Sequence, residues 1–320
     1  MFDAVLIVSF GGPQGPDDIR PFLANVLRGR RVSPERVEEV AHHYELFNGV
    51  SPLTELTRKQ ADGLRVRLAN TGHPLPVYIG MRNWHPYLTD TLKQMHADGV
   101  RRAIGFIAAA HHSYSSCQQY RENVAAAQRA LRNDAAHVDI TFVDSWFDHP
   151  QFIAANVAHV RDAVNRLPVN VREHARIVFT AHSIPKSMAD ASRYEHQLST
   201  SCAAIAAQVG RPWALVYQSR SGRPQDPWLE PDVCDYLRRE REQGLAAAVI
   251  SPVGFVCDHI EVLYDLDREA ADVCASIGLP MARAAAVNDD PLFLDMMADV
   301  VLRTVRRYET GRPLPIVSPA

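Results

Sequence analysis

The sequence predicts an α/β fold of two similar Rossmann-like domains, each with a parallel four-stranded sheet flanked by helices. About eight short and nearly continuous apolar runs alternate with longer amphipathic stretches. Such runs indicate parallel strands that are covered on both faces. The pattern restarts near residue 150, with half of the runs on each side. We therefore expect one Rossmann-like α/β domain over residues 1–149 and a second over residues 150–320.

Each expected strand ends at a turn or at a polar cluster. In the first half the apolar runs are AVLIVSF, PVYIGM, AIGFIAAA and DITFVDSW, which begin near residues 4, 76, 103 and 139. In the second half they are RIVFTAHS, WALVYQSRSG, LAAAVISPVGF and LPMARAAAV, which begin near residues 176, 213, 245 and 279. A final helical stretch, PLFLDMMADVVLRTVRRYET, could pack on either domain, including back on the first.

The turn GGPQGPDD after the first strand only superficially resembles a phosphate loop. It lacks the glycine spacing of nucleotide-binding loops, and its two prolines remove backbone donors. We expect no nucleotide site there. Asp17 is expected to cap the following helix instead, with Pro16 fixing the turn.

Composition and charge exclude several classes of protein. The chain is 47% hydrophobic and 22% charged, with a net charge of −3, so it offers no overall positive field for nucleic acid. No stretch approaches the ~20 apolar residues of a membrane helix, and no signal peptide is recognisable. The five cysteines are scattered without a C-x-x-C pair, which favours buried thiols. We expect a cytoplasmic protein.

Ligands of open α/β sheets bind beyond the carboxyl ends of the strands, in the space where the connecting loops meet. That rule predicts a cleft between the two domains. The polar residues that follow the expected strand ends are Ser9, Phe10, Arg82, His111, His112, His182, Ser183, Gln218, Ser219 and residues 258–261.

His182 follows a strongly apolar strand, in TAHSIP. A buried histidine held by nearby backbone is the simpler interpretation, but its place at a strand end favours function, because an imidazole titrates near neutral pH. Ser183 lacks the G-x-S-x-G context of a hydrolase nucleophile. His111 and His112 are adjacent on a strand end and point to opposite faces, so at least one is expected to be structural or solvent-facing.

The stretch CDHIEVLYDLDRE places Glu261, Asp265 and Glu269 four residues apart. On a helix these carboxylates line one face, at a cost of a few tenths of a kcal/mol per like-charged pair. A solvated acidic face is the usual meaning of such a run. Here the run follows a buried strand directly, so we interpret it, together with His259, as a transient site for a divalent metal ion.

These blocks together resemble the ferrochelatases, which insert ferrous iron into porphyrins in heme synthesis. The resemblance covers nearly the whole chain and rests on SFGGP, GVSPL, YIGMRNWHP, TAHSIP, VYQSRSG, PWLEP and VGFVCDHIEVLYDLD. It implies that His182 and Glu261 are the catalytic pair, on opposite sides of a bent porphyrin. It also implies that His182, Glu261, Asp265 and Glu269 contact the incoming metal. The acidic run then serves as a metal path.

The resemblance also implies a porphyrin site, for which we expect contributions from Phe10, Arg28, Arg30, Arg31, Ser51 and Tyr120. Arginines suit propionate groups because their fork is bidentate, although a solvated helix end is an equal alternative. The compact form without a long apolar lip favours coproporphyrin III, which gives coproheme. Phe10 departs from the tyrosine of several coproporphyrin enzymes. Protoporphyrin IX to protoheme, a non-catalytic tetrapyrrole or metal carrier, and a cobalt or nickel chelatase remain alternatives.

Some relatives hold a [2Fe-2S] cluster with cysteines near the carboxyl terminus. Cys117 resembles one such position, but no cysteine follows Cys274. We therefore expect no cluster and no cofactor beyond the substrate Fe²⁺. We also expect a monomer without an integral membrane segment, which makes only transient contact with neighbouring heme-pathway enzymes.

Overall fold

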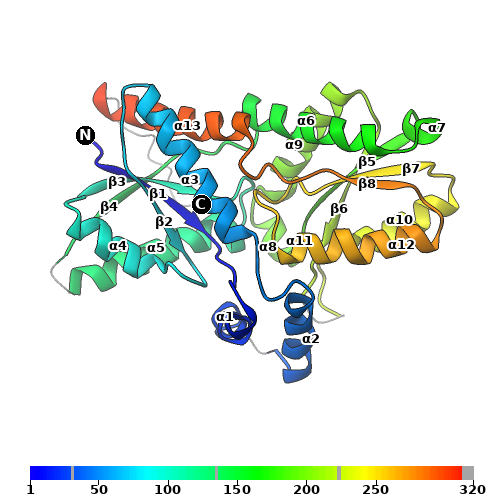
Figure 1. Cartoon of the computed structure of the whole chain (residues 1–320), viewed down its shortest axis with the longest axis horizontal. Helices are drawn as coiled ribbons and strands as arrows, with labels where there is room; N and C mark the ends of the chain where they lie inside the picture. The colour runs from blue at the N-terminus through cyan, green and yellow to red at the C-terminus, as the bar shows by residue number, and fades with distance from the viewer. Residues whose placement is uncertain (30–31, 134–135, 222–224, 312–320) are drawn as a thin grey trace.

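The computed structural model describes residues 1–29, 32–133, 136–221 and 225–311. Its strands form two parallel four-stranded sheets, which confirms the predicted fold class (Figure 1). The first sheet has the order β2-β1-β3-β4 and the second the order β6-β5-β7-β8. The strands are β1 (Ala4–Ser9), β2 (Val77–Met81), β3 (Arg102–Ile107), β4 (Asp139–Phe142), β5 (Ala175–His182), β6 (Trp213–Gln218), β7 (Ala247–Ser251) and β8 (Met281–Arg283).

Helices connect the strands and cover both sheets. In the first half they are η1 (Pro16–Asp18), α1 (Ile19–Val26), α2 (Pro34–Glu45), α3 (Leu53–Asn70), α4 (Leu88–Ala97), η2 (Tyr114–Gln118) and α5 (Gln119–Asn133). In the second half they are α6 (Pro150–Arg166), α7 (Val169–Arg172), α8 (Lys186–Asp190), α9 (Tyr194–Val209), α10 (Val233–Glu242), α11 (Ile260–Tyr264), η3 (Asp265–Ala270), α12 (Ala271–Ser276) and α13 (Pro291–Glu309). Both η2 and η3 are π-helical.

The central strands are fully buried, as their continuous apolar sequences predict. Every residue of β1 and of β7 is buried, because helices lie on both faces of each sheet. One apolar cluster contains Ile7 and Leu64 from the first half and Phe179 and Val249 from the second. The two sheets therefore share this cluster, while the other face of each sheet packs in a separate apolar cluster of its own half.

Helix α13 joins the two halves. Asp290 caps its start by accepting from Leu292 N at 2.8 Å, and Pro291 occupies its first turn. The helix packs on α3 and β3 of the first half and on α6 of the second, and Figure 1 shows it returning to the side of the molecule that holds β1–β4. A division of the chain between residues 149 and 150 stays a prediction, which limited proteolysis would test.

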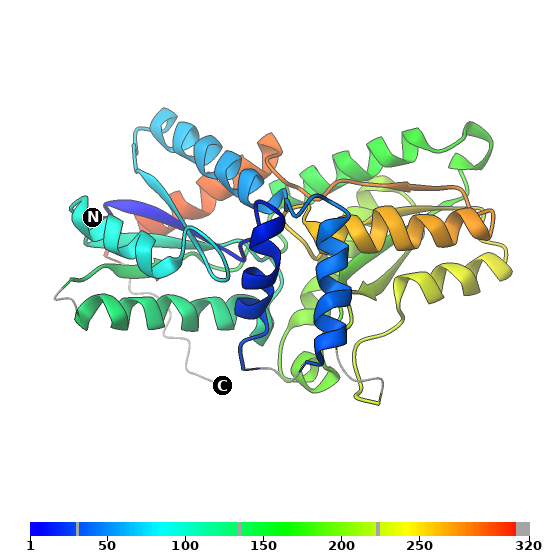
Figure 2. The same cartoon turned by 60° about the horizontal axis from the view of Figure 1, so that its bottom comes forward.

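Helices α1 and α2 stand side by side at the middle of the molecule (Figures 1 and 2). They enclose a small apolar cluster that contains Phe22, Tyr44 and Trp84, and it also contains Ile260 from α11. The helix pair thus packs against the helix that begins the acidic run.

The prediction that Asp17 caps the helix after the first strand is wrong. A short helix, η1, precedes α1, and Asp18 stands at the start of α1 without a capping hydrogen bond. The carboxylate of Asp18 instead accepts from Gln14 N at 3.0 Å and from Trp84 Nε1 at 3.1 Å. This acid therefore ties the turn after β1 to the loop after β2. Across the part of the chain that the structure describes, no helix combines the length and apolar character needed to cross a bilayer.

Candidate active site

His182 is the last residue of β5, at the carboxyl end of the second sheet. Its backbone carbonyl accepts a hydrogen bond from the buried Tyr194 hydroxyl at 3.1 Å. Its ring nitrogen Nδ1 contacts the carbonyl oxygen of Ser183. Because a carbonyl oxygen can only accept, Nδ1 carries the proton of the neutral ring, and Nε2 is left with a free lone pair.

Glu261 faces that lone pair. Its Oε2 lies 3.9 Å from His182 Nε2, and the two side chains are 43% and 34% exposed. The distance is too long for a direct hydrogen bond. The pair therefore presents two accessible proton acceptors, one from the end of β5 and one from the first turn of α11.

Glu261, Asp265 and Glu269 form what we call the acidic column. Asp265 accepts hydrogen bonds from Gln218 Nε2 at 3.1 Å and from the Ser219 hydroxyl. Burial raises the pKa of Asp265 to about 7 despite the Ser219 hydrogen bond, and the charges of Glu261 and Glu269 act in the same direction as burial. The column therefore contains a carboxyl group that exchanges its proton near neutral pH.

Burial also raises the pKa of Glu269, with a further contribution from Asp232. Burial lowers the pKa of His259 more strongly than the neighbouring Glu261 and Asp258 raise it. The His259 ring packs edge-on against Phe255, with ring centroids 5.1 Å apart. His259 therefore favours the neutral form, which leaves one ring nitrogen with a lone pair.

The spacing of the acidic column is that of a plain α-helix. The structure differs, because part of the column lies on a π-helical turn. The α-helical turns of α11 and α12 are separated by the π-helical η3, which holds both Asp265 and Glu269. Single π turns within α-helices are frequent at functional sites. The column is thus real, but its side chains are presented by a wider turn.

The column faces helix α2 of the first half. The Tyr44 pKa lies well above its ordinary value, because of burial and then because of Glu261 and Asp265. Tyr264 stacks on His43 at a centroid distance of 3.6 Å. Sequence reasoning missed Tyr44, since nothing in its local pattern distinguishes it from other buried helix residues.

Phe10 and Tyr120 come from the first half and share Arg82. The Arg82 guanidinium lies 5.8 Å from the Phe10 ring centroid and 5.6 Å from that of Tyr120. Burial raises the pKa of Tyr120 to about 12, Arg82 opposes that change, and Glu261 adds to it. Tyr120 of α5 and Glu261 of α11 therefore interact electrostatically although they belong to different halves of the chain.

The other expected porphyrin residues are less closely tied to this place. Ser51 is 3% exposed, and its hydroxyl lies 3.5 Å from Leu53 N. Arg28 is exposed and donates to Asn25 Oδ1 at 2.6 Å. Arg30 and Arg31 lie outside the described residues.

His111 is structural, as the adjacent-histidine argument predicted for at least one of the pair. It is 2% exposed, and its Nε2 lies 3.0 Å from the Ser201 hydroxyl. Burial lowers the His111 pKa to about 3. An imidazole that stays neutral at every physiological pH cannot act as an acid near pH 7.

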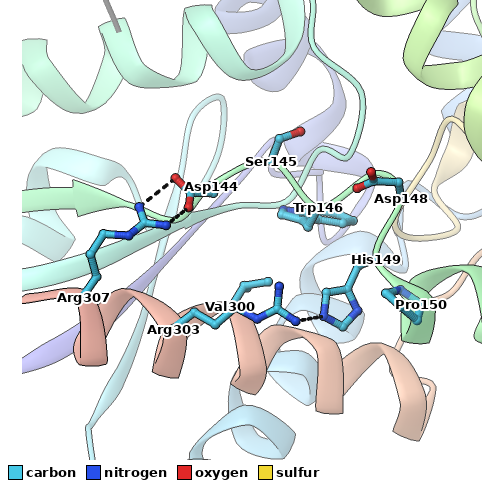
Figure 3. Close-up of a pocket in the computed structure, with 9 residues that line it drawn as sticks. All are labelled: Asp144, Ser145, Trp146, Asp148, His149, Pro150, Val300, Arg303 and Arg307. Atoms are coloured by element: carbon cyan, nitrogen blue, oxygen red, sulfur yellow. Dashed lines mark hydrogen bonds and ion pairs between the residues drawn. The ribbon is translucent and has the colours of Figure 1, made fainter. Parts of the chain in front are cut away.

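Two cavities lie elsewhere. One has a volume of about 290 Å³ and lies between residues 144–150 and α13. Figure 3 shows its lining residues, among which Arg307 pairs with Asp144 and Arg303 approaches His149. The other, of about 580 Å³, lies beside Trp84 and His85. Neither cavity contains His182 or Glu261. Among the described residues no three His, Cys, Asp or Glu side chains are grouped closely enough to hold a metal ion.

Comparison with known proteins gives matches over nearly the whole chain. The family model described as ferrochelatase matches residues 2–305. A coproporphyrin III ferrochelatase of Streptomyces griseus is 48% identical over 330 aligned residues, which cover 97% of this chain and 87% of that protein. A protein of Rhodopirellula baltica named ferrochelatase is 47% identical, over 94% of this chain and 85% of that one.

A solved structure shares the fold. The sirohydrochlorin chelatase of Bacillus subtilis subspecies spizizenii, in complex with cobalt, superposes with a TM-score of 0.57 over 98% of both chains. Its sequence is 11% identical, so this likeness concerns architecture alone.

Proposed function

Because this chain belongs to the ferrochelatase family, we propose that it inserts ferrous iron into coproporphyrin III in heme biosynthesis and so forms coproheme. The observation that carries the proposal is the facing pair of His182 and Glu261, 3.9 Å apart and accessible. The choice of porphyrin is supported by the coproporphyrin III ferrochelatases of Streptomyces griseus and Mycolicibacterium smegmatis, which are 48% and 44% identical.

Iron insertion exchanges one Fe²⁺ for the two pyrrole protons of the macrocycle. His182 Nε2 accepts one of these protons, because Nδ1 is already engaged with the Ser183 carbonyl. Glu261 supplies the second acceptor from the same side of the macrocycle, because its 3.9 Å separation from His182 Nε2 leaves no room for a ring between the two groups, contrary to the expected placement on opposite sides. The developing positive charge on the imidazole is stabilised by the Glu261 carboxylate.

Asp265 and Glu269 extend the site away from the pair. Oxygen ligands on a column of carboxylates attract Fe²⁺ and exchange it readily. Asp265 releases its proton when the metal ion arrives, which a pKa of about 7 favours at neutral pH. Glu261, Asp265 and Glu269 thus lead the ion toward His182.

The macrocycle packs against Phe10 and Tyr120, and Arg82 lies between these two rings. Stacking aromatic rings and arginine cations suit an apolar macrocycle with carboxylate edges. Arg28, Arg30, Arg31 and Ser51 remain candidates for the propionates. Arg28 follows α1 and Ser51 precedes α3, which supports a role for these two residues at the rim of the site, whereas Arg30 and Arg31 lie outside the described residues.

The deciding experiment mixes the purified protein with Fe²⁺ and either coproporphyrin III or protoporphyrin IX without oxygen. Loss of free-porphyrin fluorescence gives the rate for each. Faster turnover of coproporphyrin supports the proposal, and faster turnover of protoporphyrin assigns protoheme as the product. Binding of either porphyrin without metallation would identify a carrier, and insertion of Co²⁺ or Ni²⁺ alone would identify a different chelatase.

The catalytic pair gives a sharp prediction. His182→Ala removes the only accessible proton acceptor at the end of β5, so iron insertion falls by roughly 10²–10⁴-fold while porphyrin still binds. Glu261→Gln, which keeps the shape of the side chain, has a smaller but clear effect. Initial rates and porphyrin affinity are measured for both variants. The assignment of His182 fails if its variant turns over normally.

Four further expectations belong to the same proposal. The protein is expected to work in the cytoplasm, where thiols such as its five free cysteines stay reduced, and it is expected to be a monomer. It carries no [2Fe-2S] cluster, and the burial of Cys202 and Cys257 within the apolar core supports that expectation. Sulfide content, the visible spectrum and sedimentation test these points. Contact with neighbouring heme-pathway enzymes is expected to be transient, and a pull-down under crosslinking tests it.

A further inference from the structure

The segment that carries the acidic column is held by one arginine of a neighbouring strand. Arg283 ends β8, and its side chain is 15% exposed. Its Nε and Nη2 donate to the two carboxylate oxygens of Asp267 at 2.6 and 2.9 Å. Its Nη1 donates to Asp258 Oδ1 at 2.8 Å. One guanidinium thus contacts the residue before His259 and the middle of η3.

Asp258 is fixed from a second direction. Asn288 Nδ2 donates to Asp258 Oδ2 at 2.8 Å, and Asp258 N donates to Asn288 Oδ1 at 2.8 Å. Asn288 adopts a φ of 47°, a conformation that asparagine tolerates better than most residues. Gln60 of α3 donates to the Asn288 carbonyl at 2.7 Å. The anchor therefore continues into the first half of the chain.

We propose that Arg283 is a positioning residue for iron insertion: through Asp258 and Asp267 it sets the place of Glu261 and Asp265 relative to His182. This inference rests on the function proposed above. Arg283 belongs to neither the catalytic pair nor the acidic column. Its partner Asp267 lies between the column residues Asp265 and Glu269 in the sequence, so any movement of Asp267 also moves both of them.

The chemistry of the contact explains why an arginine is needed. A guanidinium presents a planar fork that meets both oxygens of one carboxylate and still has a third nitrogen for another. A lysine ammonium supplies the charge but not the fork. The column already contains carboxyls with raised pKa values. The positive charge of Arg283 balances the negative charges of Asp258 and Asp267. Without it, these two carboxylates would add to the electrostatic repulsion within the column.

A π turn makes such an anchor more important. Its wide hydrogen bonding is rare in helices and is retained where surrounding contacts hold it. Groups that orient metal-contacting side chains typically change metal affinity or activity by about 10–100-fold when they are removed. We expect an effect of that size on the iron step, with little effect on porphyrin binding.

The test compares Arg283→Lys and Asp267→Asn with a matched control, Arg176→Lys. Arg176 is also a partly buried arginine of the second sheet, which pairs with Glu240 and donates to Tyr236 at 2.9 Å near the start of β5. Arg283→Lys and Asp267→Asn each lower kcat for iron insertion roughly 10–100-fold with an unchanged KM for porphyrin. Arg176→Lys keeps a wild-type kcat. The double variant loses no more than the single ones, because both act through one contact.

Hydrogen exchange provides a measurement that does not depend on turnover. Arg283→Lys speeds amide exchange in residues 258–270, whereas Arg176→Lys leaves that segment unchanged. The positioning role is overturned if kcat stays at the wild-type value, or if exchange rises equally throughout the second half. If the wild-type protein inserts no iron, the proposed function fails, and the exchange comparison still decides whether Arg283 holds the segment.

Discussion

At the scale of the residue, Asp265 shows how burial changes chemistry. Water is largely excluded from its carboxyl group, and two like charges lie along the same column. Two hydrogen bonds from Gln218 and Ser219 partly offset these effects but do not cancel them. The folded protein consequently keeps a proton on this group at pH values at which an exposed aspartate has lost it.

The pH dependence of stability follows from that difference. Between about pH 4 and pH 7 the folded state binds more protons than the unfolded state, so Asp265 makes wild-type stability fall as pH rises. Asp265→Asn does not titrate. Its free energy of unfolding should therefore exceed that of the wild type by up to about 4 kcal/mol at pH 8, with a much smaller difference at pH 4.

Urea titrations of both proteins from pH 4 to pH 8 measure this effect. The variant Asp272→Asn, which replaces an exposed carboxylate of α12, is the control and should show no such trend. A difference that is constant with pH, or one that shrinks as pH rises, contradicts a raised pKa at Asp265.

The identity of His182 was predictable from the sequence, but its orientation was not. A strand end followed by TAHSIP predicts where the histidine lies. Which ring nitrogen is free depends on the Ser183 carbonyl, and the backbone at this point is fixed by Tyr194, twelve residues along the chain. Such contacts depend on the packed structure and leave no local pattern.

At the scale of the element, the end of β5 is held by the loop that follows β7. Gly254 N donates to the Thr180 carbonyl at 3.0 Å. A methyl group on Gly254 would lie 2.6 Å from Ala181 Cβ and 2.7 Å from its Cα. There is no room for any side chain, because the loop crosses directly over the residue before His182.

Gly254→Ala should therefore displace the end of β5. We expect a loss of about 1–3 kcal/mol in stability, as for other overpacked sites. Iron insertion should fall by as much as about 10²-fold, since a shift near 1 Å suffices for that. Thermal unfolding and initial rates measure the two effects.

Gly15→Ala is the matched control, because its added methyl group meets no atom within 4 Å. A Gly254→Ala protein with wild-type rates would show that the end of β5 tolerates displacement.

The π turn was beyond sequence prediction for a physical reason. An α-helix and a helix with one wide turn place apolar residues in nearly the same pattern over a few residues. Ile260, Val262 and Leu266 are buried in either case. The wider turn is contacted by residues far along the chain, Arg283 among them, and such contacts leave no local sequence pattern.

At the scale of the whole molecule, the two sheets were predictable and their shared core was not. Buried strands and the restart near residue 150 give both sheets correctly. The return of α13 to the first half depends on which faces remain uncovered after folding. Arg67 with Asp295 and Arg307 with Asp144 pair across that contact.

His149 lies where the connection between the halves meets α13. Its Nδ1 accepts from Gln151 N at 3.2 Å at the start of α6, and its Nε2 faces Asp299 Oδ2 of α13 at 3.0 Å. His149→Ala removes a helix cap and a buried polar partner, so stability should fall by about 1–3 kcal/mol. Urea unfolding, monitored by one spectroscopic probe in each half of the chain, measures the loss of stability.

Arg306→Ala serves as the control for His149→Ala. Its ion pair with Asp299 spans 3.7 Å and its side chain is 60% exposed, so its removal costs less than about 1 kcal/mol. Equal losses for the two variants would show that His149 has no special place in the junction.

The π turn also constrains which insertions and deletions the segment can accept during evolution. Deleting or adding one residue within 261–269 rotates everything beyond it by about 100° around the helix axis. Glu269 would then leave the column, and Asp267 would leave the guanidinium of Arg283. Lineages that keep the activity should accordingly confine insertions and deletions to the surface turns. A gap inside this stretch of an aligned sequence would mark a protein that has given up iron insertion.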